Sequence, residues 1–214
     1  SYSCTCPTGY ENDDSDPHLC FDVDECAESL DDCDPLATCT DTDGGFTCEC
    51  PAGYEGDGTT CELIVCDTTG VNFAAASQGS TASAPSTFPS YSTANVIDGN
   101  TSTLQSETVS WANDWPNDAP NGLPIPFDID FGQSRTVNRV VIYTSAGHEI
   151  RSYDLGYWDG TTWRWLVGTT GNSATISPHD FPTIRTSKIR ILCRAGPTFQ
   201  PTYVRLNEVE AVCN

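Results

Sequence analysis

Residues 22–61 read DVDECAESLDDCDPLATCTDTDGGFTCECPAGYEGDGTTC and decide how the first part of the chain folds. The stretch contains six cysteines, at positions 26, 33, 39, 48, 50 and 61. Six cysteines can pair in many ways, so their number leaves the pairing open. A segment this short and this rich in cysteine depends on disulfide bonds more than on a hydrophobic core.

Cysteine content and charge both change near residue 65. Nine of the twelve cysteines lie in residues 1–65, which also hold 17 Asp and Glu and no Lys or Arg, a net charge of −17. Residues 66–214 hold nine bases and 13 acids, a net charge of 9 − 13 = −4. Disulfide-rich segments persist in oxidising compartments. We therefore expect two kinds of domain in an extracellular protein, either secreted or at the cell surface.

The negative charge also excludes classes of partner. A strongly acidic module repels nucleic acids and acidic lipid surfaces, so we expect neither nucleic-acid binding nor membrane insertion. No stretch approaches the roughly 18 apolar residues of a membrane span. A surface of this kind is suited to hard cations such as Ca²⁺.

The opening stretch resembles a calcium-binding EGF-like domain. The resemblance rests on the cysteine spacing, on Asp-Val-Asp-Glu before the first cysteine and on Cys-x-Cys-x-x-Gly-Tyr near the end. It implies a module over residues 22–62 with the disulfides Cys26–Cys39, Cys33–Cys48 and Cys50–Cys61. It also implies a calcium site with side-chain ligands from three acids and carbonyl ligands from three other residues, namely Asp22, Glu25 and Asp41, and Val23, Thr42 and Gly45. The alternative is that these acids only keep a small domain soluble.

Residues 1–21 resemble the C-terminal part of another EGF-like module. In that arrangement Cys6 pairs with Cys20, and Cys4 needs a partner upstream of Ser1, so we expect the native chain to continue N-terminally. A zinc site at Cys4 and Cys6 is the alternative, but no histidine ligand lies nearby. Calcium at the junction of two such modules would make them a stiff rod.

After a linker at residues 63–65, residues 66–214 have the pattern of an all-β domain. Phe127, Ile129 and Phe131 alternate with aspartates, and the segments 153–157 and 163–167 alternate in the same way. Such alternation indicates half-buried strands. Further strands are expected at 139–145, 187–194 and 205–212. We therefore predict a mostly β chain whose larger part is a β-sandwich.

The order of motifs in this part resembles the discoidin family, the C-type domain of coagulation factors and of many galactose-binding-like modules. The motifs are ANVIDGNTST at 94–103, FDIDFG at 127–132, VNRVVIY at 137–143, YDLGYWDG at 153–160 and RLNEVE at 205–210. The resemblance implies a jelly-roll sandwich closed by a disulfide, here Cys66–Cys213. Gln105 departs from the family, which commonly has tryptophan at that place.

A second calcium site is implied by the likeness to sugar-binding relatives. Asp98 and Glu208 would supply carboxylate oxygens, Asn100 and Thr103 further oxygens, and the backbone near Asn95 a carbonyl. The alternative is an Asp-Gly turn whose carboxylate caps its own backbone. Asn100 also begins the only N-glycosylation sequon, Asn100-Thr101-Ser102, and residues 79–95 are rich in Ser, Thr and Pro, which suits O-glycans or a polar loop.

Ligands in this fold are expected on loops at one end of the sandwich. Trp111 and Trp115 could stack on a sugar, and His148 and Arg151 could bind its hydroxyls. The alternative is that both tryptophans pack inward. Cys193 follows Ile189 and Ile191 at period two, which predicts a buried thiol, while a strand at the sandwich edge would allow it to meet another cysteine.

No catalytic motif stands out, and the three histidines are scattered, so we do not expect an enzyme. The sequence favours a calcium-dependent adhesion or carbohydrate-binding protein, in which an EGF-like rod carries a discoidin head. Its partner would be a carbohydrate or an extracellular protein. The alternative is a structural subunit of an extracellular fibre, such as a matrix filament or flagellar hair, assembled as a homo-oligomer through these modules.

Overall fold

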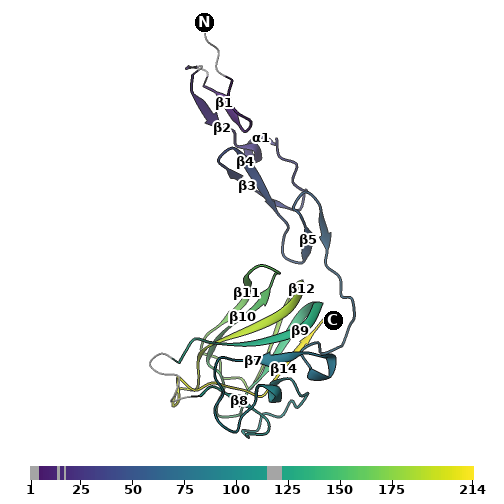
Figure 1. The fold of residues 1–214 in the computed structure, drawn as a ribbon, viewed down its shortest axis with the longest axis vertical. Coiled ribbons are helices and arrows are strands. Elements are labelled where there is room, and N and C mark those ends of the chain that lie inside the picture. The colour runs from purple at the N-terminus through teal and green to yellow at the C-terminus, as the bar shows by residue number, and fades with distance from the viewer. Residues whose placement is uncertain (1–4, 14, 17, 115–121) are drawn as a thin grey trace. The chain divides into compact units, whose positions relative to one another are not determined.

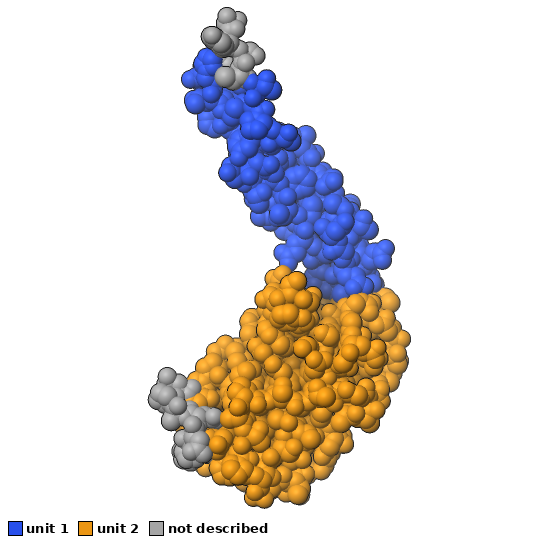
Figure 2. Space-filling model, viewed as in Figure 1, with its two compact units in different colours: residues 1–64 blue, residues 65–214 orange. Residues whose placement is uncertain are grey.

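The computed structural model describes residues 5–13, 15–16, 18–114 and 122–214. The chain forms two compact units, Ser1–Ile64 and Val65–Asn214, coloured separately in Figure 2. The division falls within the expected linker at 63–65. Both units are mostly β, with very little helix, as the sequence predicts.

Unit 1 consists of short antiparallel strand pairs and one helical turn. The pairs are β1–β2, β3–β4 and β5–β6. The elements are β1 (Tyr10–Asn12), β2 (Cys20–Asp22), α1 (Glu25–Glu28), β3 (Thr38–Thr42), β4 (Gly45–Glu49), β5 (Tyr54–Gly56) and β6 (Cys61–Leu63). The four disulfides among its described residues are the expected Cys6–Cys20, Cys26–Cys39, Cys33–Cys48 and Cys50–Cys61. Cys4 lies outside the described residues.

Local chemistry explains these short elements. The Asp24 side chain accepts a hydrogen bond from the backbone N–H of Ala27 at 2.8 Å and so caps α1. The β3–β4 hairpin turns at Asp43 and Gly44, where Gly44 has φ +84°. An Asp-Gly pair suits a two-residue hairpin turn because glycine adopts positive φ without strain.

Unit 2 consists mainly of strands, several of them long. The elements are η1 (Ala76–Gln78), β7 (Thr81–Ser83), η2 (Thr93–Val96), β8 (Trp111–Ala112), β9 (Ile125–Tyr143), β10 (Ser152–Trp158), β11 (Trp163–Thr169), β12 (Ile176–Ala195), β13 (Arg205–Leu206) and β14 (Glu208–Val212). The main sheet has the order β11-β10-β12-β9-β14, and β7 also pairs with β9. A separate pair joins β13 to β8.

The two longest strands, β9 and β12, each contribute to both layers of the sandwich (Figure 1). The first half of β9, around Ile129, pairs with β7 and with the second half of β12. The second half of β9, around Val140, pairs with β14 and with the first half of β12. The register is irregular between these halves, as is usual where strands pass from one layer to another.

The core lies between these two layers. Phe127, Ile129 and Phe131 are at most 2% exposed, which confirms the alternation predicted for this segment. Cys193 is fully buried among the same side chains and is the free cysteine of the described residues. The prediction of a buried thiol is confirmed. The disulfide Cys66–Cys213 joins the ends of the unit, as expected.

The structure of β11 differs from the sequence prediction. The segment 163–167 was expected to present Trp163, Trp165 and Val167 on one half-buried face. A β-bulge opposite Leu155 and Gly156 instead places Val167 opposite core residue Leu155 and Trp165 opposite Gly156. Because neighbouring residues of β10 face opposite sides, the indole of Trp165 lies on the outer face of the sheet and is 51% exposed.

Candidate functional site

Three loops at one end of unit 2 enclose a small cleft of about 100 Å³. The loops lie between β9 and β10, between β11 and β12, and between β12 and β13. Both charged and apolar side chains line the cleft, which is formed by Gly147, Glu149, Arg151, Asn172, Ser173, Pro197, Thr198 and Phe199. A concave site with a few polar groups on rigid strands is the usual form of a small-ligand site.

Backbone hydrogen bonds hold the loops together. The N–H of Arg151 donates to the carbonyl of Ala195 at 2.8 Å, and the N–H of Asn172 donates to the carbonyl of Arg151 at 2.9 Å. The side-chain amide of Asn172 donates to the carbonyls of Ile150 and Ala174. Asn172 therefore fixes the shape of the cleft, and its side-chain nitrogen is already occupied.

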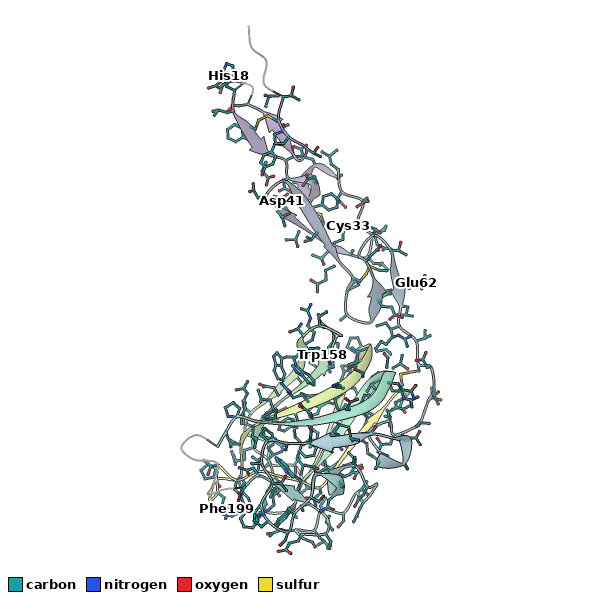
Figure 3. The ribbon with its side chains drawn as sticks, in the orientation of Figure 1. His18, Cys33, Asp41, Glu62, Trp158 and Phe199 are labelled. Atoms are coloured by element: carbon teal, nitrogen blue, oxygen red, sulfur yellow. A yellow bond between two sulfur atoms is a disulfide. The ribbon has the colours of Figure 1, made fainter. Side chains whose placement is uncertain are left out.

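The third loop is shaped by close backbone packing. A Cβ at Gly196 would lie 2.0 Å from the carbonyl oxygen of Tyr203, so only glycine fits there. The N–H of Gly196 donates to the carbonyl of Pro201, which closes the loop. This arrangement presents Phe199 at the cleft, where its side chain is 63% exposed (Figure 3).

The cleft contains one base and one acid. Among the described residues, no carboxylate forms an ion pair with Arg151, whereas six of the other bases in the unit do pair with aspartates. One carboxylate oxygen of Glu149 accepts the N–H of Gly147 at 2.8 Å. The guanidinium of Arg151 and the other oxygen of Glu149 are therefore available to a polar ligand.

His148 contacts the cleft residue Phe199 without lining the cleft itself. Its ring packs edge-on against Phe199, with 5.1 Å between ring centroids. Burial lowers the pKa of His148, and the nearby Arg205 lowers it further. The imidazole is therefore neutral near pH 7. His148 and Arg151 were both expected to bind sugar hydroxyls. Of the two, Arg151 lines the cleft and His148 does not, and hydroxyl binding by Arg151 stays a prediction.

The two predicted tryptophans do not reach the cleft. Trp111 is fully buried, its indole N–H donates to Thr87 at 3.0 Å, and its ring centroid lies 4.8 Å from that of Phe127. The prediction that Trp111 stacks on a ligand is wrong, because the ring is buried in the core and packs against Phe127. Trp115 lies outside the described residues.

Some site residues were missed from the sequence. Phe199, Asn172 and Glu149 line the cleft but were not singled out. Phe199 could have been found, since it is an aromatic residue between Pro197 and Pro201 in a loop that joins two strands. Asn172 gives no sequence signal of its own, because its role depends on the distant Ile150.

The second set of predicted calcium ligands is partly assembled around Glu208. Its side chain is fully buried; one carboxylate oxygen accepts the N–H of Gly99 at 3.2 Å, and the other has no partner. Burial raises the pKa of Glu208 to about 8, and the charge of Asp98 contributes to the rise. An unpartnered buried carboxylate oxygen is costly unless a proton or a cation is bound.

The other predicted ligands of this set make local hydrogen bonds. Asp98 accepts the N–H of Asn100 at 2.8 Å, which is the backbone-capping turn weighed as the alternative. The side chain of Asn100 accepts the N–H of Ser102, and the carbonyl of Thr103 accepts the N–H of Ala146. The amide nitrogen of Asn95 donates to the carbonyls of Glu107 and Ser110.

The predicted calcium ligands of unit 1 lie around the β3–β4 hairpin. Glu25 is 8% exposed, and its Oε2 has no partner. Asp22 accepts the N–H of Gly44 at 2.7 Å, and Thr42 donates its hydroxyl to the carbonyl of Gly45. Asp41 is exposed on β3.

The carboxylates of Asp22, Glu25 and Asp41 are not drawn into one tight cluster. In the described part of the chain, the one group whose potential ligand atoms all lie within 4.8 Å of one another is Asp31, Cys33 and Cys39. Both sulfurs of that group are in disulfides, so they are not thiolate ligands.

Comparison with known proteins agrees with this architecture. The sequence model of the F5/8 type C domain family matches residues 78–206, more than half of the chain. The chain belongs to the F5/8 type C domain family. The model of the EGF domain matches residues 26–61 of unit 1. EGF and F5/8 type C domains with five disulfides are features of extracellular proteins.

Solved structures share the fold of the F5/8 type C domain. The family 32 carbohydrate-binding module (CBM) from C. perfringens NanJ, in complex with galactose, is 21% identical with a TM-score of 0.52, over 63% of this chain and 94% of that one. CpGH89CBM32-5 from Clostridium perfringens, in complex with GalNAc-β-1,3-galactose, is 18% identical with a TM-score of 0.53, over 64% and 97%. Chitosan-binding module 1 from the chitosanase/glucanase of Paenibacillus sp. IK-5 is 24% identical with a TM-score of 0.53, over 66% and 97%.

The described residues contain no helix of the length and hydrophobicity needed to cross a membrane.

Proposed function

We propose that this protein is a non-enzymatic, extracellular carbohydrate-binding or adhesion protein whose F5/8 type C domain binds a sugar in the loop cleft. The observation that carries the proposal is the exposed ring of Phe199 beside the unpaired guanidinium of Arg151. A sugar has an apolar C–H face that packs on an aromatic ring, and hydroxyls that accept hydrogen bonds from a guanidinium. The free oxygen of Glu149 accepts a hydrogen bond from another hydroxyl.

The solved neighbours support a carbohydrate as the ligand. Two of them are complexes with galactose and GalNAc-β-1,3-galactose, and the third is a chitosan-binding module. These ligands differ from one another, so we assign the cleft to carbohydrate as a class. The size of the cleft, about 100 Å³, favours recognition of a single terminal residue.

The composition of the cleft supports binding without catalysis. Glycoside hydrolysis generally uses two carboxyl groups on opposite sides of the scissile bond. Of the residues that line the cleft, Glu149 is the only carboxylate, and Gly147 occupies one of its oxygens. The neutral His148 packs against Phe199 and does not line the cleft.

A glycan array probed with the intact chain, with and without EDTA, tests this proposal. We expect retention on a subset of glycans that share one terminal sugar, and weaker retention in EDTA. An array on which no glycan retains the chain would contradict the proposal.

We also propose that the EGF-like module binds Ca²⁺ through the side chains of Asp22, Glu25 and Asp41. The unpartnered, buried Oε2 of Glu25 supports this proposal, because a cation would satisfy it. The carbonyls of Val23, Thr42 and Gly45 would complete an oxygen-rich set.

Calcium at this place would stiffen the junction between the two EGF-like segments. The carbonyl of Gly9 accepts the N–H of Val23 at 2.9 Å, and the hydroxyl of Tyr10 donates to Asp43 at 2.6 Å. A Cβ at Gly9 would lie 2.4 Å from the carbonyl oxygen of Gly44, so the two backbones are in close contact. A bound ion would add to these contacts and restrict bending further.

Replacing Asp41 with alanine should weaken calcium binding to unit 1 by at least about tenfold, because one charged ligand is lost. Calorimetric titration of the intact chain with CaCl₂ measures the effect. Asp32→Ala is the matched control, since Asp32 is an exposed acid of the same module outside the ligand set. Equal affinities for the two variants would contradict the assignment of Asp41.

The second calcium site proposed for this protein includes Glu208 and Asp98, with Asn100, Thr103 and Asn95 around them. The unpartnered oxygen of Glu208 and its raised pKa support a cation there. Without a cation, Glu208 takes up a proton on folding, because its pKa is about 8 in the folded chain and has its ordinary value of 4.5 in the unfolded chain.

In EDTA, the contribution of Glu208 to the free energy of unfolding, taken as the difference between the wild type and Glu208→Gln, should therefore fall as the pH rises from about 4.5 to about 8. The protonated carboxyl is tolerated when buried, and its ionisation costs stability once the pH exceeds the unfolded value. Denaturant titrations at several pH values measure this trend. Added calcium should restore the stability lost at the upper end, and Glu208→Gln should remove the contribution of this group. A difference between the wild type and Glu208→Gln that stays constant over this pH range in EDTA and does not respond to calcium would contradict the prediction.

A further inference from the structure

Three tryptophans lie near the edge of the main sheet of unit 2, far from the loop cleft. They are Trp158 at the end of β10, and Trp163 and Trp165 on β11. Trp165 and Gly156 face each other across the two strands, as do Trp163 and Trp158. The outward positions of an antiparallel sheet are usually polar. A group of tryptophans at such positions is therefore a candidate binding surface.

The indole of Trp165 packs against the backbone of β10 at Gly156. A Cβ at Gly156 would lie 2.8 Å from Cε3 and 3.0 Å from Cζ3 of Trp165, so the ring covers the place where a side chain at 156 would stand. Glycine at this position lets the ring rest on the backbone. Trp165 remains 51% exposed, so much of its indole is accessible to solvent.

Fixed polar groups continue the same row across the sheet. Arg190 is the partner of Gly156 on β12, and Asp128 is the partner of Arg190 on β9. The guanidinium of Arg190 donates two hydrogen bonds of 2.7 Å to Asp128 and lies 4.0 Å from the ring centroid of Trp163. The row from Trp165 to Asp128 crosses three strand spacings, or about 14 Å.

We propose that this row, consisting of Trp165, Gly156, Arg190 and Asp128 and called here the tryptophan face, is a second carbohydrate-binding site that takes an internal pyranose ring of a glycan chain. The C–H face of the sugar packs on the indole of Trp165, and its hydroxyls bond to the Arg190–Asp128 pair. Trp163 holds the guanidinium in place by its ring face.

The tryptophan face is separate from the loop cleft. The cleft loop that contains Arg151 leads into the start of β10 at Ser152, whereas Trp158 is at the other end of that strand. Figure 3 shows Trp158 and Phe199 at opposite ends of unit 2. The cleft is concave and suits the end of a chain, while the tryptophan face lies on the outer side of the main sheet.

The small apolar area favours a sugar over a protein. Of the described exposed large apolar side chains, Trp165 is the only one on β10 or β11. A stable protein interface needs about 800 Å² per partner with an apolar centre. The charged neighbours Arg190 and Asp128 already neutralise each other, so no net charge attracts an ionic partner. A single ring face beside fixed donors and acceptors matches an uncharged pyranose.

The indole N–H signals of the intact ¹⁵N-labelled chain provide the test. The probes are the hexasaccharides of cellulose, chitin, chitosan and β-1,4-galactan, and Trp165→Phe identifies the Trp165 signal. We expect at least one hexasaccharide to shift this signal at millimolar concentration. In the variants that lack this signal, the indole N–H of the neighbouring Trp163 reports binding, and the same hexasaccharide should bind about tenfold more weakly to Trp165→Ala. Trp165→Phe retains a ring and should bind close to the wild type.

The same titrations in Phe199→Ala separate the two sites. The shift of the Trp165 signal should persist there, even if binding at the loop cleft is lost or was never present. The proposal is overturned if none of the four hexasaccharides moves the signal, or if the shift disappears in Phe199→Ala. A shift that depends on protein concentration alone would also overturn it, since a second copy of the chain would then cover the tryptophan face.

Discussion

Phe199→Ala should reduce binding of the glycan selected on the array by roughly thirtyfold, which is about 2 kcal/mol of binding free energy. Phe199 is the one large apolar side chain at the cleft that is more than half exposed, and truncation removes the surface on which the sugar packs. Its loop is fixed by backbone contacts at Gly196, so the loss of the ring should leave the fold intact. Isothermal titration calorimetry of the intact chain measures the change.

Two variants control this prediction. Phe199→Trp keeps an aromatic face and should bind within a few-fold of the wild type. Ile176→Ala truncates an exposed apolar side chain of β12 that does not line the cleft, and should bind as the wild type does. Equal affinities for Phe199→Ala and Ile176→Ala would show that the ring is not part of the binding site.

Removal of the disulfide Cys66–Cys213 should lower the free energy of unfolding of unit 2 by about 4 to 5 kcal/mol. This bond closes a loop with a sequence separation of 147 residues, so its loss frees a large part of the unfolded chain. The double variant Cys66→Ala/Cys213→Ala avoids a new free thiol. Chemical denaturation followed by tryptophan fluorescence measures the loss.

Cys193→Ala is the control for the loss of a sulfur without the loss of a cross-link. Cys193 is a buried free thiol, and its burial raises its pKa, so it behaves as a small apolar residue. Its replacement should cost about 1 kcal/mol, the cost of a small cavity. The account of Cys66–Cys213 fails if the double variant is no less stable than Cys193→Ala.

The buried state of Cys193 also bears on the fibre hypothesis. A cross-link between chains through Cys193 would require the thiol to leave the core, where it is fully buried. Cys4, the other cysteine left over by the sequence pairing, lies outside the described residues. Among the described residues, no exposed free cysteine favours assembly through interchain disulfides.

Sequence reasoning was most effective where the decisive signal is local. The cysteine spacing and the EGF-like resemblance led to the four disulfides described in unit 1, and the alternation at Phe127, Ile129 and Phe131 located the core. In both cases the residues that carry the signal lie close together in the chain, whereas Cys66–Cys213, with a sequence separation of 147, was expected from the discoidin resemblance alone.

Predictions from the sequence were wrong or incomplete where contacts between residues far apart in the chain determine the position of a side chain. Trp111 lies beside a loop rich in Pro and Asn and looked like a ligand residue, but Thr87 and Phe127 hold it in the core. The bulge opposite Leu155 and Gly156 adds one residue to β11. This extra residue places Trp165 and Val167 on opposite sides of the sheet, and the sequence pattern does not indicate it. The cleft is formed by loops that are far apart in the chain, and of the residues that line it only Arg151 was predicted from the sequence.

The most direct test of carbohydrate binding by the loop cleft is an NMR titration of the intact chain with the best glycan of the array. The account predicts that the largest backbone amide shifts fall in the three cleft loops, at Gly147 to Arg151, Asn172 to Ser173 and Thr198 to Phe199. Shifts that spare these loops and fall elsewhere in unit 2 or in unit 1 would contradict it.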